Sequence, residues 1–482
     1  MSPHDDPTRQ HYNVTLAVLT FAGIAFALQQ TMILPALPTL QHELGTTTTW
    51  ATWLLTGFLL SASVATPILG KLGDQYGKER LLVISLGVFF LGSIGATFAW
   101  DISSLIACRI LQGAGGAVFP LSFSIIKDEF PREKVSVAVG VVSAVFGVGG
   151  GLGLVLSGLI VDHLSWRWIF GLGAIGVGIA VVLVHLFVPE SPIKTRSRVD
   201  VPGAALLSLG LVALLVALSE GERWGWLSAP VLGLFALAAG SLVAWVRVEL
   251  RVPEPMVDMR MMANRPVLYA NLTGLITGLA MFGTFAVIPQ LVQLPNGLPP
   301  ALAGLADYGF GASATVTGLY LLPGAVAGFF TGPLSGVLAR RFGPHVPMAI
   351  GVGLAAMGFG MLVPWHDTSF QLLLGLGIAG AGIPMSFAAM ANVIVQSVRP
   401  SETGVATGMN TVMRTVGGVI GAQVVAAILA ADTIGATSIP AESAFTTAFA
   451  IAAVGSAIAV GVALLGAPRR ARVPVEAAAQ VE

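Results

Sequence analysis

Residues 70–80 read GKLGDQYGKER, a short run of glycines and charged residues between two long apolar segments at about 50–70 and 81–100. An apolar segment of roughly 20 residues is long enough to cross a bilayer as a helix. The run is therefore predicted to be a charged turn between two membrane helices. Glycine tolerates tight turns and close packing, and we assign that role to Gly70, Gly73 and Gly77.

A weaker copy of this turn occurs in the second half of the chain. GVLARRFG (336–343) aligns with GKLGDQYG (70–77), and GMNTVMRTVGGVIG (408–421) aligns with GVVSAVFGVGGGLG (140–153) at nearly the same offset. Two blocks at a shared offset indicate an internal duplication. Parallel repeats of this kind enclose a binding site near the middle of the bilayer.

Composition places the chain in the membrane. Of its 482 residues, 55% are hydrophobic and 10% are charged, against about 25% charged in an ordinary soluble protein. The formal net charge is zero, which argues against a nucleic-acid partner. No phosphate-binding loop, metal cluster or catalytic triad is found, so we expect no enzyme activity, no catalytic residues, no cofactor and no metal.

Fourteen segments are long and apolar enough to span a bilayer. They lie at about 14–38, 50–70, 81–100, 102–126, 135–162, 167–189, 201–219, 228–248, 267–294, 313–338, 346–364, 369–396, 403–431 and 443–466.

The basic residues support this count. With the N-terminus inside, most of the 24 Lys and Arg residues fall in cytoplasmic segments, only Arg167 and Arg223 fall outside, and Arg109 and Arg414 lie within spans. Cytoplasmic loops of membrane proteins are enriched in Lys and Arg. We therefore expect a multi-pass protein of the plasma (inner) membrane with both termini cytoplasmic.

The repeat and the spans together predict the domain organisation. Two six-helix bundles, at 13–190 and 266–466, flank two extra helices with their cytoplasmic linkers at 191–265. Residues 1–12 and 467–482 are expected to be cytoplasmic tails, the first because it lacks the pattern of a signal peptide.

Several motifs resemble those of the major facilitator superfamily, and the resemblance covers nearly the whole chain. They are GKLGDQYGKER (70–80), RILQGAGGA (109–117), WRWIF (166–170), LSEGERWGW (218–226) and TGVATGMNTVMRTVGGVIG (403–421). The last three resemble the fourteen-helix branch of drug:proton antiporters. The resemblance implies an all-α integral membrane fold with 14 transmembrane helices, in two pseudo-symmetric six-helix bundles plus two extra helices.

The resemblance also implies gating residues. Asp74 would bridge to the opposite bundle and hold the cytoplasmic side closed, and Lys78 and Arg80 would tie the loop together. In the fifth span, helix packing is assigned to Gly149, Gly150, Gly153 and Gly158. Leu154 stands where the antiporter branch usually has a proline that kinks this helix.

Two intramembrane arginines are candidates for proton coupling or substrate contact. An arginine at mid-span costs roughly 2.5–3.5 kcal/mol on insertion scales, so it needs a partner or a wet cavity. Gln112 shares a helical face with Arg109, and Asn410 lies one turn before Arg414. Asn271 in the ninth span is a further candidate. For each of these, helix–helix hydrogen bonding is the alternative.

The expected acidic partner is missing from the spans. All 24 acids fall in loops, tails or span ends, and Gln29 stands where the resemblance expects an aspartate in the first span, beside Gln30. Glutamine keeps hydrogen-bonding groups but cannot titrate. We expect Gln29 and Gln30 to line the cavity without carrying a proton.

These features predict export of a small organic compound, hydrophobic or amphipathic, such as an antibiotic. Transport would proceed by alternating access in exchange for protons, by a monomer embedded in the lipid bilayer. Open alternatives are a metabolite exporter or facilitator not coupled to protons through the first helix, a nutrient importer, and a membrane receptor or scaffold that does not transport.

Overall fold

The computed structural model describes residues 12–191, 200–294, 308–434 and 439–467. The predicted tails, 1–12 and 467–482, lie almost wholly outside these residues. Fourteen helices in the described part are long and apolar enough to cross a membrane, and no strand occurs there beyond a single bridge between Thr433 and Pro440. The predicted all-α membrane fold with fourteen spans is confirmed.

The helices of the N-terminal bundle are α1 (Tyr12–Thr31), α2 (Ile33–Glu43), α3 (Thr48–Tyr76), α4 (Lys78–Thr97), α5 (Ile102–Gln112), the 3₁₀ turn η1 (Gly113–Ala117), α6 (Val118–Glu129), α7 (Arg132–His163) and α8 (Arg167–Phe187). The extra pair is α9 (Val201–Trp224) and α10 (Ala229–Glu249). The C-terminal bundle holds α11 (Met259–Ala263), α12 (Arg265–Gln293), α13 (Ala314–Phe342), α14 (His345–Leu362), α15 (Ser369–Ser397), η2 (Pro400–Glu402), α16 (Thr403–Ala431) and α17 (Glu442–Leu465).

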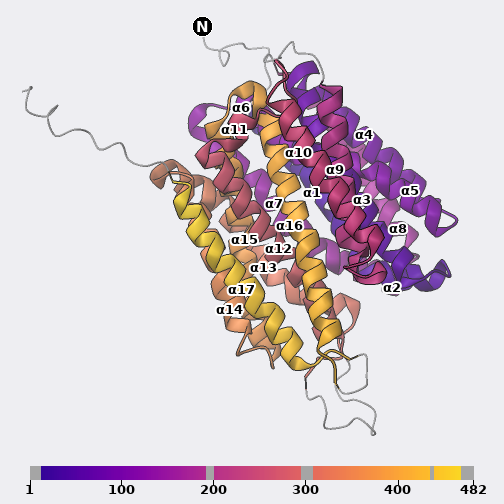
Figure 1. The fold of residues 1–482 in the computed structure, drawn as a ribbon. Coiled ribbons are helices and arrows are strands. Elements are labelled where there is room, and N and C mark those ends of the chain that lie inside the picture. The colour runs from indigo at the N-terminus through magenta and orange to yellow at the C-terminus, as the bar shows by residue number, and fades with distance from the viewer. Residues whose placement is uncertain (1–11, 192–199, 295–307, 435–438, 468–482) are drawn as a thin grey trace, which may run out of the picture.

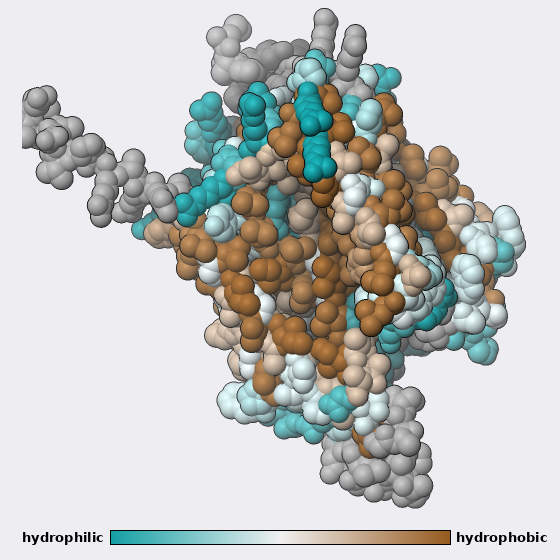
Figure 2. All heavy atoms as spheres, in the orientation of Figure 1, coloured by the Kyte–Doolittle hydropathy of each residue, from teal (hydrophilic) through white to brown (hydrophobic). Residues whose placement is uncertain are grey.

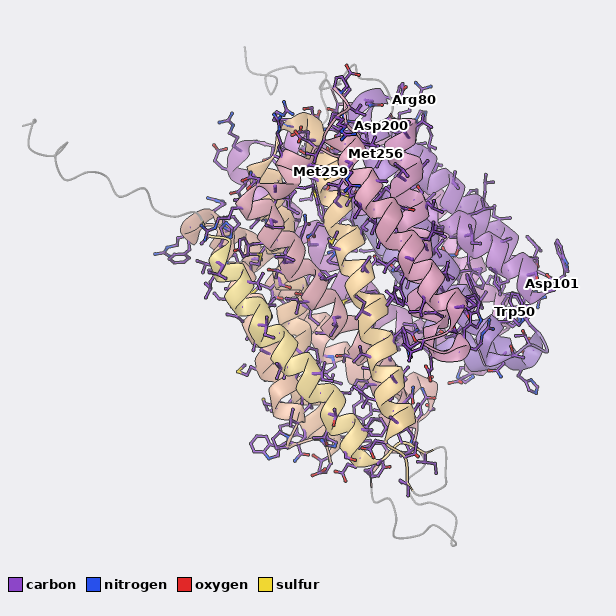
Figure 3. The ribbon with its side chains drawn as sticks, viewed as in Figure 1. Trp50, Arg80, Asp101, Asp200, Met256 and Met259 are labelled. Atoms are coloured by element: carbon purple, nitrogen blue, oxygen red, sulfur yellow. The ribbon has the colours of Figure 1, made fainter. Side chains whose placement is uncertain are left out.

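The two bundles lie side by side, with α9 and α10 along their boundary (Figure 1), where α9 packs on both α3 and α16. A broad apolar band crosses the face seen in Figure 2, between two more hydrophilic ends. We call the end that carries Arg80 and Asp200 the inner face, and the end that carries Trp50 and Asp101 the outer face (Figure 3). This naming follows the predicted topology.

The first span is broken near its outer end. Helix α1 stops at Thr31 and α2 begins at Ile33. Pro35 follows the break and has no N–H to donate to the carbonyl four residues earlier, so a straight helix cannot continue there. Leu34 and Leu37, which follow the break, line a cavity that is described below.

The predicted turn at 70–80 is much shorter than its glycines suggested. Helix α3 continues to Tyr76 and α4 begins at Lys78, so Gly77, with φ +125°, is the whole connection. A side chain is strained at that backbone angle, and a Cβ there would also lie 2.2 Å from the Glu190 carboxylate. Gly70 and Gly73 lie inside α3, where they permit close packing instead of a turn.

Candidate functional site

The Asp74 carboxylate joins the two bundles at the inner face. It accepts hydrogen bonds from the backbone amides of Gly404 (3.1 Å) and Val405 (3.3 Å) in the first turn of α16, and from the Ser124 hydroxyl (3.2 Å) on α6. Asp74 is 1% exposed. The N-terminus of a helix carries unpaired N–H groups and a partial positive charge, so a buried carboxylate is well placed there.

The backbones of α3 and α16 meet beside this contact. A Cβ at Gly70 would lie 2.6 Å from the Gly404 carbonyl oxygen, so any side chain at Gly70 would force the helices apart. Gly73 faces a different neighbour, the Leu121 side chain of α6 in its own bundle, 2.3 Å from an added Cβ. It is therefore Gly70 that allows Asp74 to reach the opposite bundle.

Lys78 lies next to Asp74 and is fully buried. Its ammonium contacts Asp128, lies 3.7 Å from the Asp74 carboxylate, and donates to the Pro400 carbonyl at 3.3 Å. The neighbouring Lys127 donates to the Val398 carbonyl at 2.6 Å. Two lysines of the N-terminal bundle thus hold the segment that leads into α16.

Arg80 does not share in this cluster. Its side chain is exposed at the inner face (Figure 3), and its backbone amide donates to the Glu190 carboxylate at 3.4 Å. That Arg80 helps to tie the loop together stays a prediction; its guanidinium interacts with the charge of Glu79 in the first turn of α4.

The inner closure extends to a second pair of helices. The Asn392 amide on α15 donates to the Ser136 carbonyl on α7 at 3.1 Å, and Gln396 donates to the Ser136 hydroxyl at 3.2 Å. Ala391 and Val395 of α15 are buried in the apolar core of the N-terminal bundle. The two bundles are therefore in tight contact across the inner face.

Arg109 belongs to a buried polar chain inside the N-terminal bundle. Its guanidinium donates to the Leu54 carbonyl (3.0 Å) and to the Gln112 side chain (2.6 Å), and lies 4.5 Å from the centre of the Phe58 ring. Gln112 donates in turn to the Ser93 hydroxyl at 2.9 Å. All of this lies away from solvent, since Arg109 and Gln112 are both 0% exposed.

Gln29 ends the same chain. It accepts a hydrogen bond from Ser93 at 3.0 Å, is 0% exposed, and packs against Gly173 of α8. The structure therefore places Gln29 inside the bundle and not at the cavity, contrary to expectation. Gln30 is partly exposed and lies one turn before Leu34, which lines the cavity described below. Its side-chain oxygen is buried and has no hydrogen-bond partner.

A second polar group lies in the C-terminal bundle. The Asn410 amide donates to the Ala270 carbonyl (3.2 Å) and to the Asn271 side chain (3.1 Å), which joins α16 to α12. The Arg414 guanidinium donates to Thr411 at 3.1 Å and lies 4.3 Å from the centre of the Phe387 ring. Asn271 and Asn410 are thus bonded to each other, and Arg414 lies one turn along α16 from Asn410, where both border Gly274 of α12. All three side chains are buried.

The glycines of α7 divide into two sets. Gly149 and Gly153 face α1, where an added Cβ would lie 2.4 Å from Ala27 and 2.0 Å from Thr31. Gly158 faces Thr315 of α13 at 2.7 Å, and Gly150 has open space and borders a small pocket. Helix α7 runs unbroken through Leu154, where the antiporter branch has its kink.

A cavity of about 530 Å³ lies between the bundles toward the outer face. It is bordered by α2 and α7 on one side and by α12 and α13 on the other. Its polar lining consists of Gln290, Gln293 and Thr317, and its other side chains are mostly apolar. A smaller apolar pocket of about 80 Å³ shares Phe285 and Leu321 with it and reaches Phe387, over which Arg414 is stacked.

Among the gating and coupling candidates, Gly150 alone borders these two spaces. Leu154, also noted from the sequence, lines the larger one, and so do Gln290 and Gln293, polar residues of the ninth span that the sequence offers as possible cavity lining. Sequence analysis missed Asp128, Ser93 and Ser136, which carry the contacts described above. Asp128 had a local signal, since it is an acid among basic residues at the inner end of a span. Ser93 and Ser136 had none, because a single serine in an apolar helix is unremarkable.

The extra helices and the segment that follows them also form polar contacts with α3. The Trp53 indole donates to Glu220 of α9 at 2.9 Å near the outer face, and Arg223 lies 2.8 Å from the same carboxylate. At the inner face Lys71 donates to the Pro255 carbonyl at 2.9 Å.

The chain matches the family described as Major Facilitator Superfamily over residues 19–422 and 272–481. Multidrug transporter protein MdtP of Bacillus subtilis is 30% identical over 399 residues, which are 81% of this chain and 70% of that protein. An uncharacterized MFS-type transporter of Mycobacterium tuberculosis is 31% identical over 402 residues. These cover 82% of this chain but 56% of that relative, so the chain matches just over half the relative's length.

Two solved structures share the fold at low sequence identity. The human organic anion transporter MFSD10 (TETRAN) has a TM-score of 0.65 at 16% identity, covering 95% of this chain and all (100%) of that one. The proton:xylose symporter XylE has a TM-score of 0.60 at 16% identity, covering 93% and 94%. With its motifs, its fourteen helices and these matches, the chain belongs to the Major Facilitator Superfamily, as the sequence predicted.

Proposed function

We propose that this protein exports small hydrophobic or amphipathic organic compounds by alternating access, as a monomer in the cell membrane. The observation that carries the proposal is the asymmetry between the two faces. The bundles are locked together at the inner face by Asp74, Lys78 and Asn392, while a cavity of about 530 Å³ lies between them toward the outer face. This is the arrangement expected of an outward-facing state.

The cavity supports the proposed substrate class. Its size falls within the range of small-molecule sites, about 300–1,000 Å³, and its lining is mainly apolar with a few amides and a hydroxyl. No Asp or Glu lies in the lining of either space, and the Arg414 guanidinium stacks on Phe387, which lines the smaller pocket. Neutral or anionic compounds therefore fit better than cations. The name of the Bacillus relative, a multidrug transporter, supports the same substrate class.

Exchange against protons is the form of energy coupling that the family resemblance favours. One observation favours a second candidate, an exporter or facilitator not coupled to protons through the first helix. The buried carboxylates of the described residues all lie at or near helix ends. In the first span, Gln29 has an amide, which cannot titrate, at the position where the family resemblance expects an aspartate.

Flux measurements on reconstituted vesicles test the proposal. Lipophilic dyes of matched size that are neutral, anionic or cationic are followed with and without an imposed pH gradient, and with an ionophore that collapses it. We expect saturable transport that favours the neutral or anionic dye and stops with the ionophore. Transport that ignores the gradient would favour the second candidate, and no transport of any dye would contradict export of this compound class.

A further inference from the structure

Three side chains of the kind that binds metal ions meet at the outer end of the C-terminal bundle. His366 and Asp367 lie in the connection between α14 and α15, and Glu442 is the first residue of α17. Their ligand atoms all lie within 4.8 Å of one another. None of these three residues lines the cavity described above, although Pro440, two residues before Glu442, does.

His366 is held in an orientation that suits a metal ligand. The side chain is 4% exposed, its ring packs against Phe449 with 5.7 Å between ring centres, and its Nδ1 atom lies 2.8 Å from the Leu362 carbonyl oxygen. A carbonyl only accepts hydrogen bonds, so Nδ1 must carry a hydrogen. In the neutral ring this leaves a lone pair on Nε2, and a carbonyl partner of this kind commonly orients zinc-binding histidines.

The lone pair of His366 faces a carboxylate. Nε2 lies 3.6 Å from the Glu442 carboxylate and has no hydrogen-bond partner, although the atom is buried. Two electron-rich atoms facing each other in this way repel unless a positive charge lies between them. The 3.6 Å separation is close to the roughly 3.3 Å between two ligands on one tetrahedral zinc ion with bonds of about 2.0–2.1 Å.

The two carboxylates can complete such a site. Asp367 and Glu442 are exposed, so small rotations bring their oxygens to bonding distance without disturbing the core. The Asp367 backbone is fixed, because its amide donates to the Gln371 side chain at 3.0 Å. Three protein ligands leave a fourth position for water.

We propose that His366, Asp367 and Glu442 form a binding site for a divalent cation of the zinc class on the outer face. The imidazole ligand distinguishes this class from Ca²⁺ and Mg²⁺, which prefer sites made of oxygen atoms. The bound ion joins the α14–α15 connection to the start of α17. The sequence analysis expected no metal because Glu442 lies far along the chain from His366, so no local ligand spacing marks the site.

Zinc binding to the purified full-length protein, with any affinity tag removed, tests this site. Zn²⁺ is titrated in competition with a chromogenic chelator, and thermal unfolding is followed in parallel with and without Zn²⁺. We expect one equivalent bound per chain and a rise in unfolding temperature with Zn²⁺, because an ion that binds only the folded state stabilises it. Ca²⁺ or Mg²⁺ at the same concentration should not displace the Zn²⁺.

Single substitutions assign the ligands. Glu442→Gln and Asp367→Asn alter exposed side chains, so they should fold normally, yet each should weaken Zn²⁺ binding at least tenfold. His163→Gln is the matched control, because His163 is an exposed histidine beside Asp162 at the outer end of α7. That variant should bind Zn²⁺ as the wild type does.

Two outcomes would overturn the proposal. One is binding of Zn²⁺ that Glu442→Gln and Asp367→Asn leave unchanged, which would place the ion elsewhere. The other is that Zn²⁺ does not bind stoichiometrically, while Glu442→Gln unfolds at a lower temperature than the wild type whether or not Zn²⁺ is present. That result would mean that a protonated His366 pairs with Glu442. Neither result bears on the proposed export, since these residues do not border the cavity.

Discussion

At the scale of single residues, a buried charge in this molecule is placed where a partner compensates it. Asp74 is among the most buried acids, yet it accepts two backbone N–H groups at a helix N-terminus and has Lys78 at 3.7 Å. Hydrogen bonds to charged groups contribute about 1.5–3 kcal/mol, against about 0.5–1.5 kcal/mol for neutral ones. The charge of Asp74 therefore strengthens contact between the bundles more than an amide would.

Asp74→Asn should weaken the inner closure. The amide oxygen can keep both backbone bonds, because Gly404 and Val405 donate to one oxygen of Asp74, but the negative charge is lost and the amide N–H groups face the Lys78 ammonium. The closed inner face then loses on the order of 1.4 kcal/mol, or about tenfold in population. We expect transport to fall by at least that factor in reconstituted vesicles while membrane protein levels stay near normal. Glu133→Gln, an exposed acid on the same face, is the control and should transport normally. Unchanged flux in Asp74→Asn would remove the gating role.

Arg109→Ala should disable the protein for a different reason. The substitution empties a buried site and leaves Gln112 and the Leu54 carbonyl without their donor, which costs about 1–3 kcal/mol for each unsatisfied group. We expect loss of transport accompanied by a lower unfolding temperature in detergent. Loss of transport at an unchanged unfolding temperature would point instead to a direct part in coupling, and full activity would exclude both roles.

At the scale of elements, close helix crossings depend on glycine. Helices α7 and α13 pack along their length, with Gly140 against Gly332 at the inner end and Gly158 against Thr315 at the outer end. Small residues let helix backbones approach closely in a bilayer, where no hydrophobic effect drives helices together. The repeat alignment located Gly140 from sequence, but not the residue that it meets.

Gly332→Val should separate α7 from α13 at the inner face. A Cβ at Gly332 would lie 2.5 Å from the Ala144 side chain and 2.8 Å from the Gly140 carbonyl oxygen. Overpacking of this kind costs about 1–3 kcal/mol, and we expect a lower unfolding temperature with reduced transport. Gly360→Val is the matched control, because nothing lies within 4 Å of an added Cβ there. Equal behaviour of the two variants would contradict the close packing.

At the scale of the whole molecule, the closed inner face and the outer cavity define one of two alternating states. The apolar cores show the same closure, since Ala391 and Val395 of α15 are buried among residues of the N-terminal bundle. A substrate could not reach the cavity from the inner side without breaking this contact. The state is therefore testable by the reactivity of introduced cysteines.

Cysteine labelling should report the sidedness of this state. In a Cys108→Ser background, Gln293→Cys at the exposed cavity lining should react quickly with a membrane-impermeant thiol reagent added at the outer face. Val395→Cys, 2% exposed in the wild-type packing, should react slowly from either face. Adding Asp74→Asn should speed the reaction of Val395→Cys from the inner face. Rapid labelling of Val395→Cys without Asp74→Asn would contradict the closed inner face.

The sequence by itself determined the number of membrane helices and the family, and it predicts their sidedness and an internal duplication. Each follows from local properties: the length of an apolar segment, the charges beside it, and short glycine-rich motifs. The turn at 70–80 shows the limit of such signals, because three similar glycines have two different roles, and only the helix contacts separate Gly77 from Gly70 and Gly73.

Only the tertiary structure decided which polar groups meet. Gln29 bonds to Ser93 inside its own bundle, Lys78 contacts Asp128, and His366 faces Glu442. The structure also brings Leu34, Leu154 and Gln290, from three different helices, to one cavity. In a bilayer, a polar side chain must find its partner within the protein. That partner lies on another helix, often in a distant part of the chain, so its identity depends on how the helices pack and cannot be read from the residues beside it.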